Sequence, residues 1–377
     1  MSFGKRPGPA SATPAGDEPG ENEALARVFA RLIANHGPIS LMNYMGESNA
    51  RYYSSRDPLG STGDFITAPE ISQIFGELIG LWLADIWLRA GRPEPIHYVE
   101  LGPGRGTLAR DILRTVKRFG LEPRVHFVET SVKLKDVQLA AVPNAFFHDD
   151  LSSVPQTGRL LVIANEFLDA LPVHQLVRTE TGWRERMVGF YEDRFLPVAG
   201  RQPMDGAIPE ARRDAPVGTI IETSPGAAAV VQEVARRLVQ QGGAALFIDY
   251  GYLEVQDGST LQAVRAHEKV DPFVDPGEAD LTTHVDFATL AQMAQDFGAR
   301  WLGTVEQGVW LKALGADARA RALGQLAPAH ATSVWVAKER LVSPDQMGSL
   351  FKVMGLVAPN WPDGEAFDGP AAGVEAE

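Results

Sequence analysis

One segment of the chain, HYVELGPGRGT at residues 97–107, passes from apolar residues into a turn of alternating glycines. The apolar periodicity of Thr107 to Phe119 predicts a helix directly after the turn. A strand, a glycine-rich turn and a helix in this order place backbone N–H groups at the carboxyl end of the strand, where α/β sheets bind their ligands. We therefore expect an α/β domain with a binding site at this turn.

Short apolar runs alternate with helix-length segments around this turn. The expected strands are His97–Leu101, Val125–Glu129, Ala145–His148, Leu160–Ala164 and Ala244–Asp249. This alternation is typical of a parallel sheet with helices on both faces, so the sequence predicts a doubly wound α/β fold. Later segments predict helices at Val285–Phe297 and Ala316–Leu326 and strands at Ser333–Ala337 and Leu350–Val357.

The 377 residues divide into six expected regions. They are a disordered tail (1–20), an N-terminal helical segment with a lid-like loop (21–95), a first core part (96–172), a β-hairpin insertion (173–222), the remaining core with accessory helices (223–362) and a second disordered tail (363–377). Thr181-Gly182 between two apolar runs predicts the hairpin of the insertion. Thr67 followed by Pro69 and Glu70 predicts a capped helix that begins at Ala68.

Composition narrows the classes of function. The charge balance of 35 Lys and Arg against 48 Asp and Glu gives −13, which opposes a broad contact with nucleic acid. The absence of cysteine excludes disulfides, thiolate nucleophiles and Cys-ligated metals. Histidine and acid spacings match no metal motif, so we expect no metal site. No run of about 18 apolar residues occurs, so we expect no membrane insertion.

The glycine turn differs from the two common phosphate-binding motifs. A dinucleotide fingerprint would need glycine at position 107, where this chain has Thr107, and a triphosphate loop would need a lysine. The turn instead has the form acid-x-Gly-x-Gly-x-Gly. Glu129 ends the next strand 23 residues after Gly106, where an acid accepts hydrogen bonds from both hydroxyls of a ribose. The pattern favours a nucleoside cofactor other than NAD or ATP.

This arrangement resembles the S-adenosylmethionine-dependent methyltransferases. By that resemblance Glu100, Gly102, Gly104 and Gly106 form the loop around the methionyl part of the cofactor, and Glu129 is the ribose acid. The resemblance also implies that Asp149 or Asp150, after the third strand, approaches the adenine. From the residues alone, a solvated turn or a helix cap explains these two aspartates nearly as well.

Longer blocks resemble one family, the methyltransferases typified by a mitochondrial complex I assembly factor and called MidA in some lineages. The matching blocks are Gly63–Ser72, Phe75–Gly76, Val99–Gly106, Asn165–Pro172 and Gly277–Phe287. The family implies a Rossmann-like methyltransferase sheet with an antiparallel last strand, bound S-adenosyl-L-methionine and dimethylation of a protein arginine. Its implied partner is the quinone-proximal core subunit of NADH:quinone oxidoreductase.

Arginine methylation needs acids that hold a guanidinium, because this cation does not lose its proton in isolation. Carboxylates accept its N–H groups in a fork and localise the positive charge. Glu166 and Asp169 follow the fourth strand and would face the cofactor cleft together if their segment is helical. We expect catalytic roles for these two acids and for Asn165. By family resemblance Asp64 lies on a segment that folds over the cofactor, where it or Glu70 supplies a further carboxylate.

Two other functions stay open at this point. One is a cofactor-binding assembly factor or chaperone with little catalysis, and the other is an NAD-dependent oxidoreductase, which Thr107 disfavours. The acidic N-terminus is unlike an arginine-rich transit peptide, so we expect a bacterial cytoplasmic location, with the mitochondrial matrix as the alternative.

Overall fold

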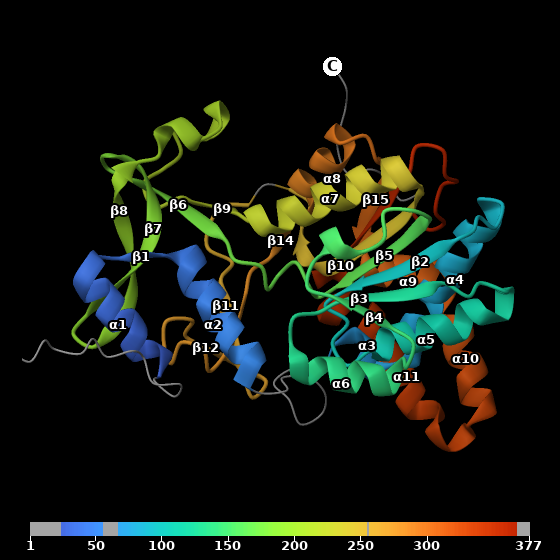
Figure 1. The fold of residues 1–377 in the computed structure, drawn as a ribbon. Helices are drawn as coiled ribbons and strands as arrows, with labels where there is room; N and C mark the ends of the chain where they lie inside the picture. Colours follow the sequence, from blue (N-terminus) through green and yellow to red (C-terminus); the bar gives the residue numbers. More distant parts are fainter. Residues whose placement is uncertain (1–23, 56–66, 255, 368–377) are drawn as a thin grey trace, which may run out of the picture.

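The computed structural model describes residues 24–55, 67–254 and 256–367. Its larger sheet has the strand order β15-β16-β10-β5-β2-β3-β4, with β14 beside β10 (Figure 1). The strands are β2 (Ile96–Leu101), β3 (Arg124–Val128), β4 (Phe146–His148), β5 (Arg159–Asn165), β10 (Gly243–Tyr252), β14 (Val285–Asp286), β15 (Arg300–Glu306) and β16 (Phe351–Val357). All five strands predicted as a parallel set are present and parallel, and the last strand, β16, is antiparallel to β10 as the resemblance implied.

One strand prediction is wrong, and the edge strand β15 was missed. Ser333–Ala337 lies in helix α11 (Ala331–Val342), because its β-branched run belongs to a longer helix that buries Leu341 and Val342 in the core. The edge position next to β16 is instead taken by β15. All seven residues of β15 are half-buried and a bulge interrupts its pairing after Trp301, so the strand lacks the alternation that sequence reasoning needs.

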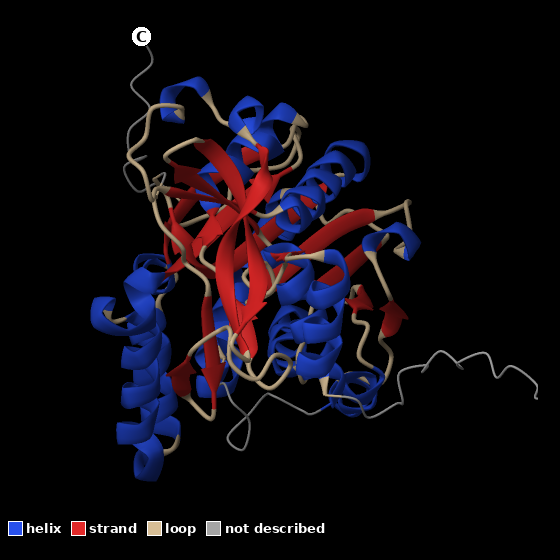
Figure 2. Cartoon of the chain, turned by 90° about the vertical axis from the view of Figure 1, so that its left-hand side faces the viewer, coloured by secondary structure: helices blue, strands red, loops and turns tan. Residues whose placement is uncertain are grey.

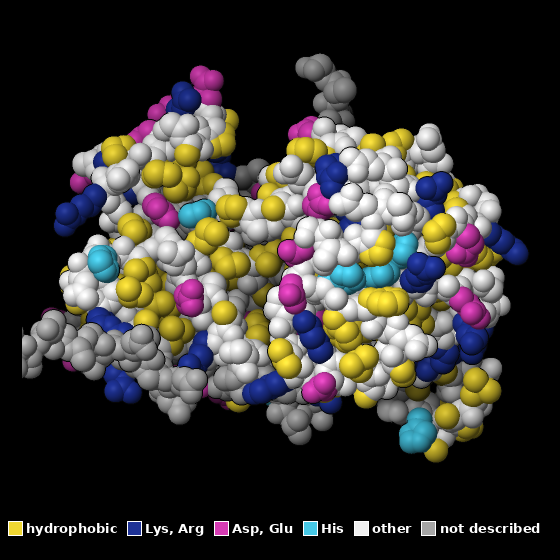
Figure 3. Space-filling view, in the orientation of Figure 1, with side chains coloured by type: hydrophobic (Ala, Val, Ile, Leu, Met, Phe, Trp, Pro, Cys, Tyr) yellow, Lys and Arg dark blue, Asp and Glu magenta, His cyan; other side chains and the backbone are white. Residues whose placement is uncertain are grey.

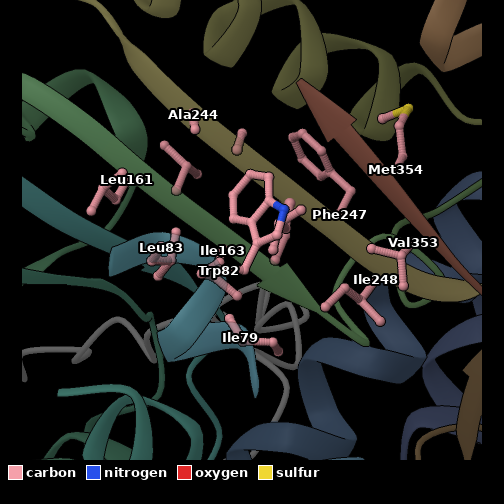
Figure 4. Close-up of a cluster of buried hydrophobic side chains, with 14 of the residues drawn as sticks. Ile79, Trp82, Leu83, Leu161, Ile163, Ala244, Phe247, Ile248, Val353 and Met354 are labelled. Carbon is pink, nitrogen blue, oxygen red and sulfur yellow. The ribbon is translucent and has the colours of Figure 1, made fainter. Parts of the chain in front are cut away.

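Helices cover both faces of this sheet. They are α4 (Gln73–Arg89), α5 (Thr107–Val116), α6 (Val132–Ala141), α7 (Pro225–Gln241), α8 (Phe287–Asp296), α9 (Gln307–Ala313), α10 (Ala316–Leu326) and α11. Helix α4 is buried nearly all round, and Figure 4 shows its Trp82 side chain among apolar side chains of β5, β10 and β16. A helix of this kind forms because burial of its apolar surface offsets the cost of ordering the chain.

A second, smaller sheet holds the insertion. Its strands β1 (Ile39–Ser40), β6 (His174–Thr179), β7 (Gly182–Tyr191), β8 (Arg194–Pro203) and β9 (Ile220–Thr223) follow the order β1-β7-β6-β9, with β8 beside β7. The predicted hairpin is confirmed, since Thr179 pairs with Gly182 across the turn. Three short strands, β11 (Gln262–Arg265), β12 (Glu268–Val270) and β13 (Asp280–Thr282), form a third sheet.

The predicted N-terminal region 21–95 is shared between two hydrophobic cores. Helices α1 (Leu25–His36) and α2 (Leu41–Ser55) pack with the insertion, where Phe29, Tyr44 and Leu281 share one apolar cluster. Helix α4 packs instead on the larger sheet. Figure 1 shows α1, α2 and the insertion strands together on the left of the molecule, and Figure 2 views the molecule from that side. We call this side, residues 24–55 with 173–223 and 260–283, the small lobe.

Three histidines cross the larger sheet as a chain of hydrogen bonds. His97 Nδ1 lies 2.8 Å from His126 Nε2, and His126 Nδ1 lies 2.9 Å from His148 Nε2. The ends of the chain contact the carbonyl oxygen of Thr157 and the hydroxyl of Ser153, each at 2.9 Å. Figure 3 shows histidine side chains grouped on the face of the molecule where these strands lie. Burial lowers the pKa of His126 to about 4.

Candidate active site

A cavity of about 430 Å³ lies at the carboxyl ends of β2, β3 and β5. The larger sheet, the glycine turn and the small lobe all contribute to its wall. Its lining includes the predicted residues Glu100, Gly102, Gly104, Glu129, Asn165 and Glu166, and also Asn49, Tyr53, Thr67, Glu70, Ser131 and Phe167. Gly106 and Asp169 are absent from this described lining.

The glycine turn needs its glycines for conformation and for space. Gly102, Gly104 and Gly106 have φ of 60°, 54° and 75°, in the left-handed region that favours glycine. A Cβ on Gly102 would lie 2.8 Å from the Phe167 ring. Gly106 is the N-cap of α5 and provides no side-chain cap, so the first N–H groups of α5 are available to a ligand beside Thr107.

Glu100 lines the cavity and is buried. The Tyr98 hydroxyl donates a hydrogen bond of 2.5 Å to its Oε2. Burial raises the pKa of Glu100 to about 8, and the Tyr98 hydrogen bond opposes this rise. Sequence reasoning identified Glu100 but missed Tyr98, which looks like any other strand residue in the sequence.

Glu129 follows β3 with both carboxylate oxygens held by the protein. Ser131 N–H donates to Oε1 at 2.7 Å, and Gln138 Nε2 donates to Oε2 at 3.1 Å. Gln138 Nε2 also donates to the carbonyl oxygen of Gly104 at 2.8 Å. The fully buried Gln138 on α6 therefore joins the predicted ribose acid to the glycine turn. No local sequence signal distinguishes it from a glutamine on the helix surface.

Asn165 and Glu166 form the opposite wall. Glu166 has a positive φ of 50°, and its Oε1 accepts hydrogen bonds from Ala68 N–H at 3.1 Å and from Asn165 Nδ2 at 3.0 Å. Burial raises the pKa of Glu166 to about 7, and the Asp169 carboxylate adds to the rise. Asn165 is 9% exposed, and its Oδ1 has no partner among the residues that the structure describes.

The helical segment on which a shared direction of Glu166 and Asp169 depended is not present. The segment after β5 is a turn, and Glu166 lines the cavity whereas Asp169 does not. Asp169 hydrogen-bonds with the Tyr250 hydroxyl, and burial raises its pKa to about 6. Its catalytic role stays a prediction.

The helix predicted to begin at Ala68 is present, but Thr67 does not cap it. Helix α3 (Ala68–Ile71) follows Thr67, whose side chain makes no cap hydrogen bond. The N–H of Ala68 donates instead to Glu166, a contact between residues 98 positions apart. The chain then bends at Ser72, which caps α4 by accepting from Ile74 N–H at 3.2 Å.

Two predicted adenine-site residues have local roles. Asp149 forms an ion pair with Lys135 at 3.1 Å, and Asp150 Oδ1 accepts from Ser152 N–H at 2.8 Å. Neither lines the cavity, so their contact with adenine stays a prediction. Asp64 lies outside the described residues.

The sheet order with its antiparallel last strand, the glycine turn and the acid after the second strand define a nucleoside-cofactor methyltransferase. Residues 78–305 match the model of a family described as S-adenosyl-L-methionine-dependent methyltransferases. The chain belongs to this family.

Relatives over nearly the whole chain agree with this assignment. The protein arginine methyltransferase NDUFAF7, mitochondrial, of Xenopus laevis is 37% identical, with 88% of this chain and 85% of the relative covered. Its human counterpart of the same name is 35% identical, with 91% and 86% covered. A Burkholderia thailandensis crystal structure bound to S-adenosyl-homocysteine has a TM-score of 0.79 and 28% identity, and 94% of this chain and 98% of that one are covered.

The residues of the cavity fit S-adenosylmethionine. Each Glu129 oxygen accepts one described hydrogen bond and keeps a lone pair for a ribose hydroxyl. The uncapped N-terminus of α5 suits the methionyl carboxylate, and Gly102 keeps the turn close to Phe167 without a side chain between them. The cofactor prediction is confirmed by the family, and the oxidoreductase alternative is wrong.

Proposed function

We propose that this enzyme transfers a methyl group to an arginine side chain of a protein substrate. The observation that carries the proposal is a pair of acceptors that lack donors. Asn165 Oδ1 has no described partner, and both hydrogen bonds to the Glu166 carboxylate arrive at Oε1, so Oε2 has no donor within the described chain. An unmet buried acceptor such as Asn165 Oδ1 is costly, and a guanidinium provides five N–H donors in a fixed fork.

Glu166 has the chemistry that this substrate needs. Its carboxylate accepts guanidinium N–H groups, fixes the plane of the group and draws positive charge away from the attacking nitrogen. Ala68 N–H and Asn165 Nδ2 hold Oε1 in place, so the side chain is oriented before the substrate arrives. S-adenosylmethionine, when bound, supplies a methyl group activated by its positively charged sulfur. Asn165 and Asp169 are proposed to support Glu166 in catalysis.

The names of the relatives support a protein arginine as the target. We propose the quinone-proximal core subunit of NADH:quinone oxidoreductase as the substrate, with methylation supporting assembly of that complex. The proposed location is the bacterial cytoplasm, with the mitochondrial matrix as the alternative. In the described part of the chain, no helix is long and apolar enough to cross a membrane.

The test is mass spectrometry of the partner subunit after incubation with the enzyme and S-adenosylmethionine labelled in its methyl group. We expect labelled dimethylarginine with the wild type and a loss of at least 100-fold with Glu166→Gln. The matched control is Glu122→Gln, since the Glu122 side chain is 73% exposed. Cofactor and subunit binding without methylarginine from the wild type would indicate an assembly factor and overturn the proposal.

A further inference from the structure

The turn that carries Glu166 is held by one side chain of the neighbouring strand. Asp249 on β10 is 1% exposed. Its Oδ2 accepts three consecutive backbone N–H groups, from Phe167 at 3.1 Å, Leu168 at 2.9 Å and Asp169 at 3.2 Å. Its Oδ1 accepts from Tyr250 N–H at 3.0 Å. Four donors therefore converge on one buried carboxylate.

The turn begins in an unusual conformation. Glu166 N–H still donates to the carbonyl oxygen of Ile248 at 2.9 Å, so β5 remains paired with β10 up to this residue. The positive φ of Glu166 then turns the chain out of the sheet. Residues with a side chain rarely adopt this conformation, and it persists where surrounding contacts fix it. Three N–H groups directed at a single oxygen provide such contacts.

The same turn separates two neighbouring side chains. Phe167 lines the cofactor cavity, and its ring fills the space that a side chain at Gly102 would occupy. Leu168 is buried in the core of the larger sheet. A different path of the turn would exchange these positions and move Glu166 away from Ala68 and Asn165. The direction of the turn thus determines whether Glu166 faces the cavity.

Asp249 lies among groups of the same charge. Burial and the nearby carboxylates of Asp169 and Glu166 raise its pKa, while the backbone N–H groups oppose the rise. The four described hydrogen bonds are all donated to the Asp249 carboxylate by backbone N–H groups, so this side chain acts as an acceptor throughout. The four donated hydrogen bonds offset the cost of burying this acid, so the turn and the acid stabilise each other.

We infer that Asp249 is the positioning residue that fixes Glu166 for methyl transfer. The inference rests on the proposed function for the role of Glu166, and on the structure alone for the hold on the turn. Removal of the Asp249 carboxylate frees three N–H groups and lets the turn change its path. In Asp249→Asn the amide oxygen can still accept from the turn, but the NH₂ group faces the N–H of Tyr250. We therefore expect this variant to hold the turn in part.

The test compares Asp249→Ala and Asp249→Asn by hydrogen exchange and by kinetics. For Asp249→Ala we expect amide protection at residues 167–169 to fall at least 100-fold and kcat to fall about 100-fold, with amide protection elsewhere in the core of the larger sheet unchanged. Asp249→Asn should recover part of both losses. The control is Asp286→Ala, which removes a carboxylate that caps α8 through Thr289 N–H; it should leave these amides and kcat unchanged.

The two proposals fail in different ways. Full protection and full kcat in folded Asp249→Ala, with Glu166→Gln inactive, would overturn the role of Asp249 and leave the proposed function standing. Loss of protection throughout the core would also overturn it, because Asp249 would then support the whole fold. If the wild type forms no methylarginine, the proposed function fails, and the exchange data still decide whether Asp249 holds the turn.

Discussion

Two buried clusters of ionisable side chains differ in how completely they are paired. In the histidine chain the carbonyl oxygen of Thr157 can only accept, so His97 donates to it through Nε2–H. His97 Nδ1 then accepts from His126, and His126 Nδ1 accepts from His148. Every ring nitrogen has a partner once the three rings are neutral with the proton on Nε2.

The second cluster, which we call the carboxylate cluster, consists of Glu166 and Asp169 with Asn165 at the end of β5. Its hydrogen-bonding groups are not all paired. Asn165 Oδ1 is buried without a described partner, and the Glu166 carboxylate has donors on one oxygen. Folded proteins pair nearly all their buried polar groups, so an unpaired acceptor beside a cavity indicates where a ligand supplies the donor. Full pairing in the histidine chain indicates a structural role, and the unpaired acceptor that lines the cavity indicates a binding role. Four predictions test this distinction.

The largest effect should come from Asn165→Leu. It removes the unpaired acceptor and one hydrogen bond to Glu166, so kcat/KM for the protein substrate should fall by about 100-fold to 1000-fold, or about 3–4 kcal/mol. The free energy of unfolding should change by less than about 1 kcal/mol, because removal of the costly unpaired acceptor offsets loss of the hydrogen bond to Glu166. Chemical denaturation and steady-state kinetics measure the two quantities. A loss of stability equal to the loss of activity would mean that Asn165 is structural.

The histidine chain should behave in the opposite way, with a pH-dependent contribution to stability and none to turnover. A folded-state pKa of about 4 for His126, below the ordinary value of 6.5, means that its stabilisation is present above pH 6.5 and is lost as the pH falls toward 4. The difference in unfolding free energy between wild type and His126→Leu should shrink by up to about 3 kcal/mol over this range, before screening by solvent. Glu100 and Glu166 have raised folded-state pKa values, so their contribution to stability falls as the pH rises. This contribution is the same in both proteins and cancels in the difference between them. A constant difference would contradict the neutral chain.

The pH dependence of catalysis should be set by the carboxylate cluster. The ionised form of Glu166 binds guanidinium, and burial raises its pKa to about 7 in the free enzyme. The value of kcat/KM should therefore fall about tenfold per pH unit below 7, or about 1.4 kcal/mol per unit. The midpoint for kcat should be lower, because a bound cation stabilises the carboxylate. The same midpoint in both profiles would argue against a contact between Glu166 and the substrate.

The smallest effect should come from Asp149→Asn. The Asp149 side chain is 84% exposed and pairs with Lys135, so its loss should change stability by less than about 1 kcal/mol. We expect the Kd of S-adenosylmethionine to change less than twofold in calorimetry. A tenfold weaker Kd would establish the adenine contact predicted from the sequence.

Features whose signal lies within a few neighbouring residues could be predicted from the sequence. The parallel strands, the glycine turn, the helix start at Ala68 and the acids Glu100 and Glu129 all have signals within a few residues. The structure adds contacts between distant residues, such as Asp249 with the turn after β5 and Gln138 with Gly104. The positive φ of Glu166 also had no signal, because glutamate rarely adopts it. Side chains that orient the site were therefore missed, whereas the acids Glu100, Glu129 and Glu166 that line it were found.

The shared core of the small lobe has a consequence for synthesis on the ribosome. Asn49 on α2 exchanges hydrogen bonds with the backbone of Leu281, which is 232 positions later in the chain. At a translation rate of 5–20 residues per second, Leu281 is synthesised roughly 10 to 50 s after Asn49. During that interval the part of α2 that packs on β13 lacks its partner, so a chaperone has time to bind it.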